Sequence, residues 1–150
     1  MVLDLIKEEL FKREDVRETE TTPTQGINYL SISYTDFHGD EPDVDDVTYG
    51  NNHFTTNAAI TAVWAPINLP HGAIITEIVV YGNDATNTWV MYRNEILNGA
   101  QGSMGGANIN TKDTTLSHTT IDNTAYSYTI KVTGMAATDE INCAIITYTT

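Results

Sequence analysis

Alternation of apolar and polar residues is the feature of this chain that most constrains its fold. In "NYLSISYT" (residues 28–35) and "AYSYTIKVT" (residues 125–133), apolar side chains recur at every second position, with Ser, Thr or Lys between them. A period of two places the apolar residues on one face of a β-strand, so both stretches predict half-buried strands. In "AIITEIVVYG" (residues 73–82) both faces are apolar, which predicts a central strand covered on both sides or a strand at a subunit contact.

Further strands are expected from the remaining apolar runs. These runs lie at residues 59–65, 88–93, 114–121 and 141–149. The glycine-rich stretch "NGAQGSMGGAN" (residues 98–108) is predicted to be a mobile loop, and no helical pattern follows residue 27. About eight short strands at this spacing are typical of an all-β protein, here a two-sheet antiparallel sandwich of jelly-roll type spanning residues 27–150.

A different periodicity precedes residue 27. Apolar residues recur at spacings of three and four within residues 2–17, which predicts a short α-helix. Its apolar face comprises Leu3, Ile6, Leu10 and Phe11. A polar extended arm follows, so residues 1–26 are assigned as an N-terminal helix and arm. Because so short a helix is marginal alone in water, we expect its apolar face to mediate contacts in a homo-oligomer, a trimer or larger.

The charge balance excludes several classes of partner. The chain has 7 Lys and Arg against 20 Asp and Glu, a formal net charge of −13. Such a surface repels phosphate backbones and anionic lipids, so we expect no nucleic-acid partner and no membrane insertion, whereas neutral glycans remain open. Charges interrupt the apolar residues of positions 1–15, so this chain is predicted to carry no signal peptide. Arg93, one of the few bases after residue 17, is expected to pair with a carboxylate.

The acidic stretch "FHGDEPDVDDVTYGNNH" (residues 37–53) raises the question of a metal site. Its candidate calcium ligands are Asp40, Asp43, Asp45 and Asp46. A helix–loop–helix calcium loop counted from Asp43 needs glycine at its sixth position and glutamate at its twelfth, where this chain has Thr48 and Phe54. We therefore expect a solvated loop that holds no metal tightly, with a looser calcium site on the sandwich as the alternative.

No stretch predicts a catalytic centre. The glycine-rich run lacks the lysine and the following helix of a phosphate loop, and Gln101 stands where a nucleophile elbow around Ser103 would need glycine. The single cysteine, Cys143, alternates in phase with Ile141 and Ile145 and is expected to be a buried, unreactive thiol. The sequence thus predicts a protein that is not an enzyme and holds no cofactor.

The aromatic residues give the best argument for ligand binding. Trp64, Trp89 and eight tyrosines occur on the predicted sandwich, and exposed aromatic rings stack on sugar rings. Trp64 is in phase with the apolar Ile60 and Ala62, however, and Trp89 opens a predicted strand. Both indoles are therefore candidates for glycan stacking and equally candidates for the core.

The predicted strands and turns also carry several short motifs, each of which occurs once in the chain. The motif residues are Pro66, Leu69, Pro70, Gly72 and Ala73, then Tyr92 and Arg93, and then Asp122, Asn123, Tyr126 and Tyr128. With "YLSI" near the start and "AIITYT" at the end, the pattern resembles a widespread, largely uncharacterised group of bacterial secreted or surface proteins. The resemblance covers residues 29–149 and implies a β-sandwich without an established activity.

Two functional hypotheses follow. The first is a non-catalytic structural subunit of a homo-oligomeric assembly (a virion, surface filament or particle), in which the N-terminal helix and arm mediate subunit contacts. The alternative is a glycan- or surface-binding sandwich, with or without calcium. Either hypothesis implies a location on an extracellular surface or in a virion.

Overall fold

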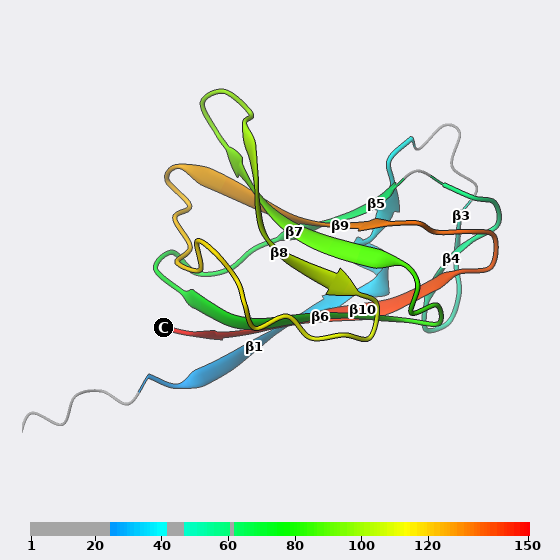
Figure 1. The fold of residues 1–150 in the computed structure, drawn as a ribbon, viewed down its shortest axis with the longest axis horizontal. Coiled ribbons are helices and arrows are strands. Elements are labelled where there is room, and N and C mark those ends of the chain that lie inside the picture. The colour runs from blue at the N-terminus through cyan, green and yellow to red at the C-terminus, as the bar shows by residue number, and fades with distance from the viewer. Residues whose placement is uncertain (1–24, 42–46, 61) are drawn as a thin grey trace, which may run out of the picture.

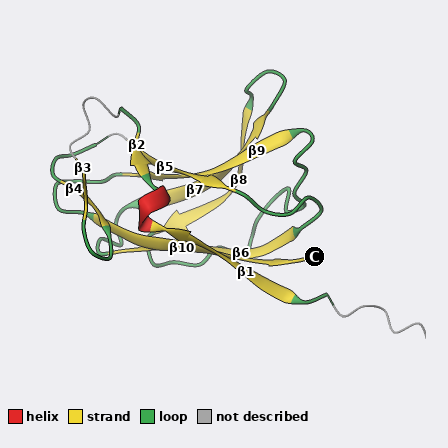
Figure 2. Cartoon of the chain, turned by 180° about the vertical axis from the view of Figure 1, so that it is seen from behind, coloured by secondary structure: helices red, strands yellow, loops and turns green. Residues whose placement is uncertain are grey.

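The computed structural model describes residues 25–41, 47–60 and 62–150, and these residues form two antiparallel sheets that face one another (Figure 1). The strands are β1 (Ile27–Ser33), β2 (His38–Gly39), β3 (Val47–Tyr49), β4 (Phe54–Thr56), β5 (Ala62–Ile67), β6 (Ile74–Gly82), β7 (Thr88–Glu95), β8 (Gln101–Asn108), β9 (Tyr126–Thr133) and β10 (Glu140–Thr149). Among the described residues the only helical element is a 3₁₀ turn, η1 (Tyr34–Asp36), seen from behind in Figure 2. The predicted all-β, two-sheet antiparallel sandwich is confirmed.

The two sheets have simple strand orders. Sheet A runs β1-β10-β4-β3, and β6 pairs with the edge of β10 opposite β1. Sheet B runs β2-β5-β9-β7-β8. Neither order follows the sequence, so residues far apart in the chain become neighbours within each sheet.

The core lies between the sheets and follows the alternation in the sequence. In β9, Tyr128, Ile130 and Val132 point inward and are buried. They meet the inward residues of the neighbouring strand β7, where Met91 lies opposite Ile130 and Trp89 opposite Val132. Burial of these inward side chains removes apolar surface from water and stabilises the packing of one sheet on the other. The period-two pattern places all of them on the same face of the sheet.

The prediction for residues 73–82 is right about burial on both faces, since Val79 and Val80 are both buried, but wrong about a central position in the sheet. The central strand is β10, which pairs with both β1 and β6, and β6 is not central. The edge of β6 that faces away from β10 is covered by the segment around Asp113. Ile78 and Asp113 exchange backbone hydrogen bonds of 3.1 and 2.9 Å. This segment was predicted as a strand at 114–121, but it forms only isolated bridges and turns. Its backbone is satisfied at the sheet edge without a full ladder.

The glycine-rich residues 98–108 are a strand rather than a loop. Residues 101–108 form β8, paired along β7. A Cβ on Gly106 would lie 2.5 Å from the carbonyl oxygen of Trp89, and one on Gly105 would overlap Leu116 and the carboxylate of Asp113. Close approach of neighbouring backbone requires glycine here, and this tertiary requirement overrides the low strand propensity of glycine.

A β-bulge in β10 corrects the placement of Cys143. The register against β6 shifts between Ile141 and Cys143, so the two side chains do not share a face. Ile141 lies in the core, whereas Cys143 is half-buried outside it. Partial burial nevertheless raises the pKa of the Cys143 thiol, which disfavours the reactive thiolate.

No helix in the described parts of the chain is long and apolar enough to cross a membrane.

Candidate functional site

The outer face of sheet B presents one half-buried indole, that of Trp64. Trp64 lies in β5, where Val63 and Ala65 on either side of it point into the core. Alternation therefore turns the Trp64 side chain away from the core, opposite His38 of β2 and Lys131 of β9.

Three side chains from three elements fix the indole. The indole N–H of Trp64 donates a 2.7 Å hydrogen bond to Oδ1 of Asp40, which follows β2. The ammonium of Lys131 lies 4.8 Å from the centre of the Trp64 ring, and the ring of Tyr92 lies 6.2 Å away at an interplanar angle of 40°. We call Asp40, Trp64, Tyr92, Thr129 and Lys131 the Trp64 platform. Its ring is held in one orientation before any ligand arrives.

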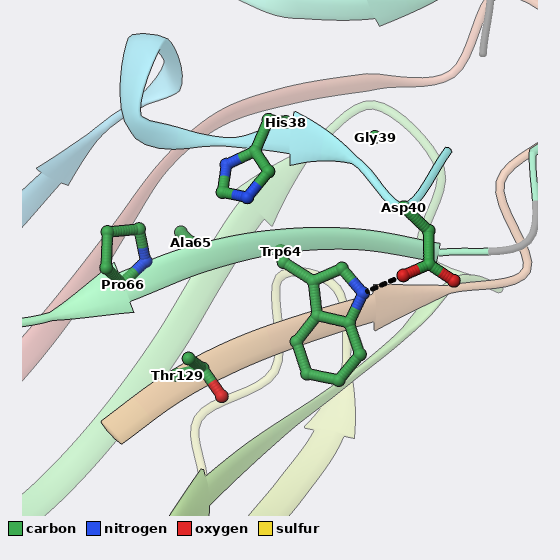
Figure 3. Close-up of a pocket in the computed structure, with 7 residues that line it drawn as sticks. All are labelled: His38, Gly39, Asp40, Trp64, Ala65, Pro66 and Thr129. Atoms are coloured by element: carbon green, nitrogen blue, oxygen red, sulfur yellow. Dashed lines mark hydrogen bonds between the residues drawn. The ribbon is translucent and has the colours of Figure 1, made fainter. Parts of the chain in front are cut away.

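A hollow of about 520 Å³ lies beside the indole (Figure 3). It is lined by His38, Gly39, Asp40, Trp64, Ala65, Pro66 and Thr129. In Figure 3 the ring of Pro66, the imidazole of His38 and the hydroxyl of Thr129 surround the space next to the indole. The hollow thus combines apolar walls with hydroxyl, imidazole and carboxylate groups that form hydrogen bonds.

Polar side chains continue from the hollow across the sheet. The amide of Asn94 on β7 donates a 3.2 Å hydrogen bond to the hydroxyl of Thr129, and the amide of Gln101 on β8 donates one of 2.9 Å to Oδ1 of Asn94. Asn94 lies directly opposite Gln101, whereas Thr129 is diagonal to Asn94, because its partner on β7 is Tyr92. The outer face of sheet B therefore carries an aromatic end and an amide-rich end.

The second tryptophan proposed for stacking is not available. Trp89 is 0% exposed, lies in the core cluster, and donates its indole N–H to the carbonyl of Asn108 over 3.2 Å. Its strand position turns it inward beside Val132. Trp89 is a core residue, and the glycan-stacking alternative for it is wrong.

The calcium hypothesis is tested only at one residue. Asp43, Asp45 and Asp46 lie outside the described residues. Asp40 uses one carboxylate oxygen to hold Trp64, a role that the sequence did not reveal. Within 25–41, 47–60 and 62–150, no group of three or more His, Cys, Asp or Glu side chains is arranged to hold a metal.

The predicted assembly residues also fall outside the described part. Leu3, Ile6, Leu10 and Phe11 lie in the undescribed positions 1–24.

The motif residues mostly build one structural corner. Asn123 donates its amide to the carbonyl of Leu69 over 2.9 Å, and the backbone N–H of Asp122 donates to the hydroxyl of Tyr128 over 2.8 Å. Hydrogen bonds from Thr124 hold the pKa of the Asp122 carboxyl below its usual value. This corner joins two turns from distant parts of the sequence, and His71 lies 3.7 Å from the Asp122 carboxylate.

Arg93 departs from its predicted role. Its guanidinium carbon lies 4.7 Å above the ring of Tyr126, and no carboxylate among the described residues forms an ion pair with it. Within the described residues, β7 and β9 place an aromatic face next to the arginine in place of the expected carboxylate.

Sequence reasoning found Trp64 but missed the rest of the platform. Asp40, Tyr92 and the β9 pair Thr129 and Lys131 come from three separate stretches that only strand pairing brings together. Outward positions of predicted strands were the one available signal, since Thr129 and Lys131 occupy the polar phase of β9.

No family model and no curated protein matches the sequence. Among solved structures, the chain is similar to a carbohydrate-binding module from Cellvibrio mixtus lichenase 5A, solved in complex with cellotriose. That match has 18% identity and a TM-score of 0.39, and it covers 78% of this chain and 95% of the module. At this identity and TM-score, the match says nothing about what this chain binds.

Proposed function

We propose that this protein is a non-catalytic binding sandwich that recognises neutral glycans on the Trp64 platform. The observation that carries the proposal is the outward indole of Trp64, held by Asp40 and Lys131 beside an open hollow. A rigid, half-exposed ring costs little entropy on binding, because its orientation is already fixed.

The chemistry of the hollow suits a sugar ring. The axial C–H face of a pyranose is apolar and stacks on an indole, while its hydroxyls need donors and acceptors around the edge. Asp40 supplies an acceptor, because its Oδ2 receives no hydrogen bond from the described residues. His38 and Thr129 supply further polar atoms on the opposite side of the hollow.

Charge favours neutral over anionic glycans. Lys131 is the one cation of the platform and lies over the ring of Trp64, while the whole chain carries a net charge of −13. A sulfated or carboxylated chain would approach against this field, whereas a neutral oligosaccharide would not.

A glycan array followed by calorimetry tests the proposal. The full chain is screened against neutral and anionic oligosaccharides, and we expect it to retain neutral ones. Trp64→Ala should lower the affinity for the best ligand at least about tenfold. The chain has two tryptophans and Trp89 is buried, so a change of intrinsic fluorescence on binding should come from Trp64 and disappear in Trp64→Phe.

Tyr29→Ala is the matched control, because Tyr29 is an exposed aromatic residue of sheet A. It should bind as the wild type does. A cooperative thermal melt of Trp64→Ala shows that the variant is folded. Retention of no neutral glycan by the wild type, or equal affinity of wild type and Trp64→Ala, would contradict the proposal.

The other hypotheses stay predictions. The structural subunit depends on residues 1–26, which lie outside this site, and the extracellular or virion location and the resemblance to bacterial surface proteins are not needed for glycan binding. Glycan binding requires none of them.

A further inference from the structure

The edges of the two sheets are protected unequally. Segment 109–121 covers two edges: the N–H of Asn110 bonds to the carbonyl of Val80 on β6, and that of Ser117 to Met104 on β8, over 2.8 and 2.7 Å. β2 and β3 are only two and three residues long. Beyond β2, the edge of β5 carries Pro66, which has no N–H to offer. Short strands, covering segments and proline are the usual protections of a sheet edge.

β1 is the one long edge in the described parts of the chain that lacks such protection. It is seven residues long and pairs only with β10. The backbone N–H of Ser33 donates to the carboxylate of Asp36 and so points away from β10. The backbone N–H groups of the other odd-numbered residues of β1 point the same way. By alternation, the N–H and C=O groups of Ile27, Tyr29 and Ser31 point away from the sheet. No hydrogen bond to another described residue uses them.

The side chains of this edge are apolar or uncharged. Ile27 and Tyr29 are 66% and 69% exposed on the outer face, and β1 contains no charged residue. The chain as a whole carries a net charge of −13, so a second copy is repelled by most of its surface. β1 is therefore a strip where two copies can approach without bringing like charges together.

We propose that β1 pairs antiparallel with β1 of a second copy of this chain, so that two A sheets join into one continuous sheet around a twofold axis. A strand edge is complementary to itself under twofold symmetry, which makes the contact isologous and closed. The free backbone groups of Ile27, Tyr29 and Ser31 supply the hydrogen bonds. The contact lies on the opposite sheet from the Trp64 platform and does not depend on glycan binding.

Solution mass and amide exchange of the full chain test the proposal. In light scattering over a concentration series, the wild type should rise from the mass of one chain to twice that mass. Tyr29→Lys, which places a charge on the strip, and Ser31→Pro, which removes an outward N–H but no bond to β10, should both remain at the mass of one chain. In the wild type, exchange of the Tyr29 and Ser31 amides should slow as concentration rises, while the Leu30 and Ile32 amides stay slow throughout.

Leu97→Lys is the matched control. Leu97 is 93% exposed at the tip of the β7–β8 hairpin, which projects away from sheet A (Figure 1), so the variant makes the same change of charge at a distant apolar residue. It should dimerise as the wild type does. A wild-type monomer at every concentration, a dimer that survives in both β1 variants, or Tyr29 and Ser31 amides already protected at the lowest concentration would each overturn the proposal. The last result would mean that the edge is covered within one chain.

Discussion

The strands β1 and β8 both lie at the edge of a sheet. They differ in how strongly their residues favour a strand and in whether another segment covers their edge. β1 is rich in strand-forming residues, and no other described residue covers its outer edge. β8 is rich in glycine, yet Ser117 and the Asp113 carboxylate bond to its backbone. A strand with few side chains has little to pack, so contacts from a neighbouring segment must hold it. Strand propensity and edge protection are therefore separate properties of this chain.

The largest expected effect is at Gly106 in β8. Gly106→Ala places a methyl group against the carbonyl oxygen of Trp89 and the backbone of Val90, neither of which can move without shifting β7. We expect a loss of about 3 kcal/mol in the free energy of unfolding, measured by chemical denaturation.

Gly102→Ala provides the control in the same strand. A Cβ at Gly102 meets only the side chain of Arg93, at 3.3 Å from Nε, and that side chain can move. The stability of this variant should be close to that of the wild type. If both alanine variants are equally stable, the close approach of β7 and β8 is not what requires glycine.

The next effect is expected at the residue that covers β8. The buried Asp113 accepts hydrogen bonds of 2.8 Å from the Gly106 N–H and of 2.7 Å from both the N–H and the hydroxyl of Thr115. Asp113→Ala should lower the free energy of unfolding by about 2 kcal/mol at pH 7. Asp84 makes the same turn with Thr86 but has no bond to another strand, so Asp84→Ala should cost clearly less.

The same variant has a signature in its pH dependence. Burial alone would raise the pKa of Asp113, but the hydrogen bonds from Thr115 and Gly106 hold that pKa below its ordinary value of 3.8. The charged carboxylate therefore stabilises the fold above pH 3.8, and this contribution is lost as the pH falls through the lower pKa of the folded state. The stability gap between wild type and Asp113→Ala should shrink in acid. A gap that is constant down to pH 2 would contradict this role.

The smallest effect is expected on the open edge. Ser31 is exposed, and no segment in the described part of the chain bonds to the outer side of its backbone, so Ser31→Lys should change the stability of the monomer by less than about 0.5 kcal/mol. Denaturation at low protein concentration measures this without interference from self-association. A loss as large as that at Asp113 would show that this edge is protected after all.

Much of the sandwich could be predicted because its inward residues are local information. The alternation in β1 and β9 assigns each side chain to a face without knowledge of its neighbours. The errors occurred where neighbours decide. β8 resembles a loop until the close backbone of Trp89 is known, and the bulge in β10 that separates Cys143 from Ile141 has no sequence signature of its own.

The candidate site likewise has features that the sequence predicts and features that only strand pairing creates. The sequence by itself determined that one tryptophan or both could face outward, that bases are scarce, and that no familiar catalytic motif is present. Only the tertiary structure decided that Trp89 is core and Trp64 is not, and that Asp40 and Lys131 hold the Trp64 indole. The physical reason is that a period of two gives the two faces of a strand, whereas the choice of partner across a sheet depends on register, which is set by all the strands together.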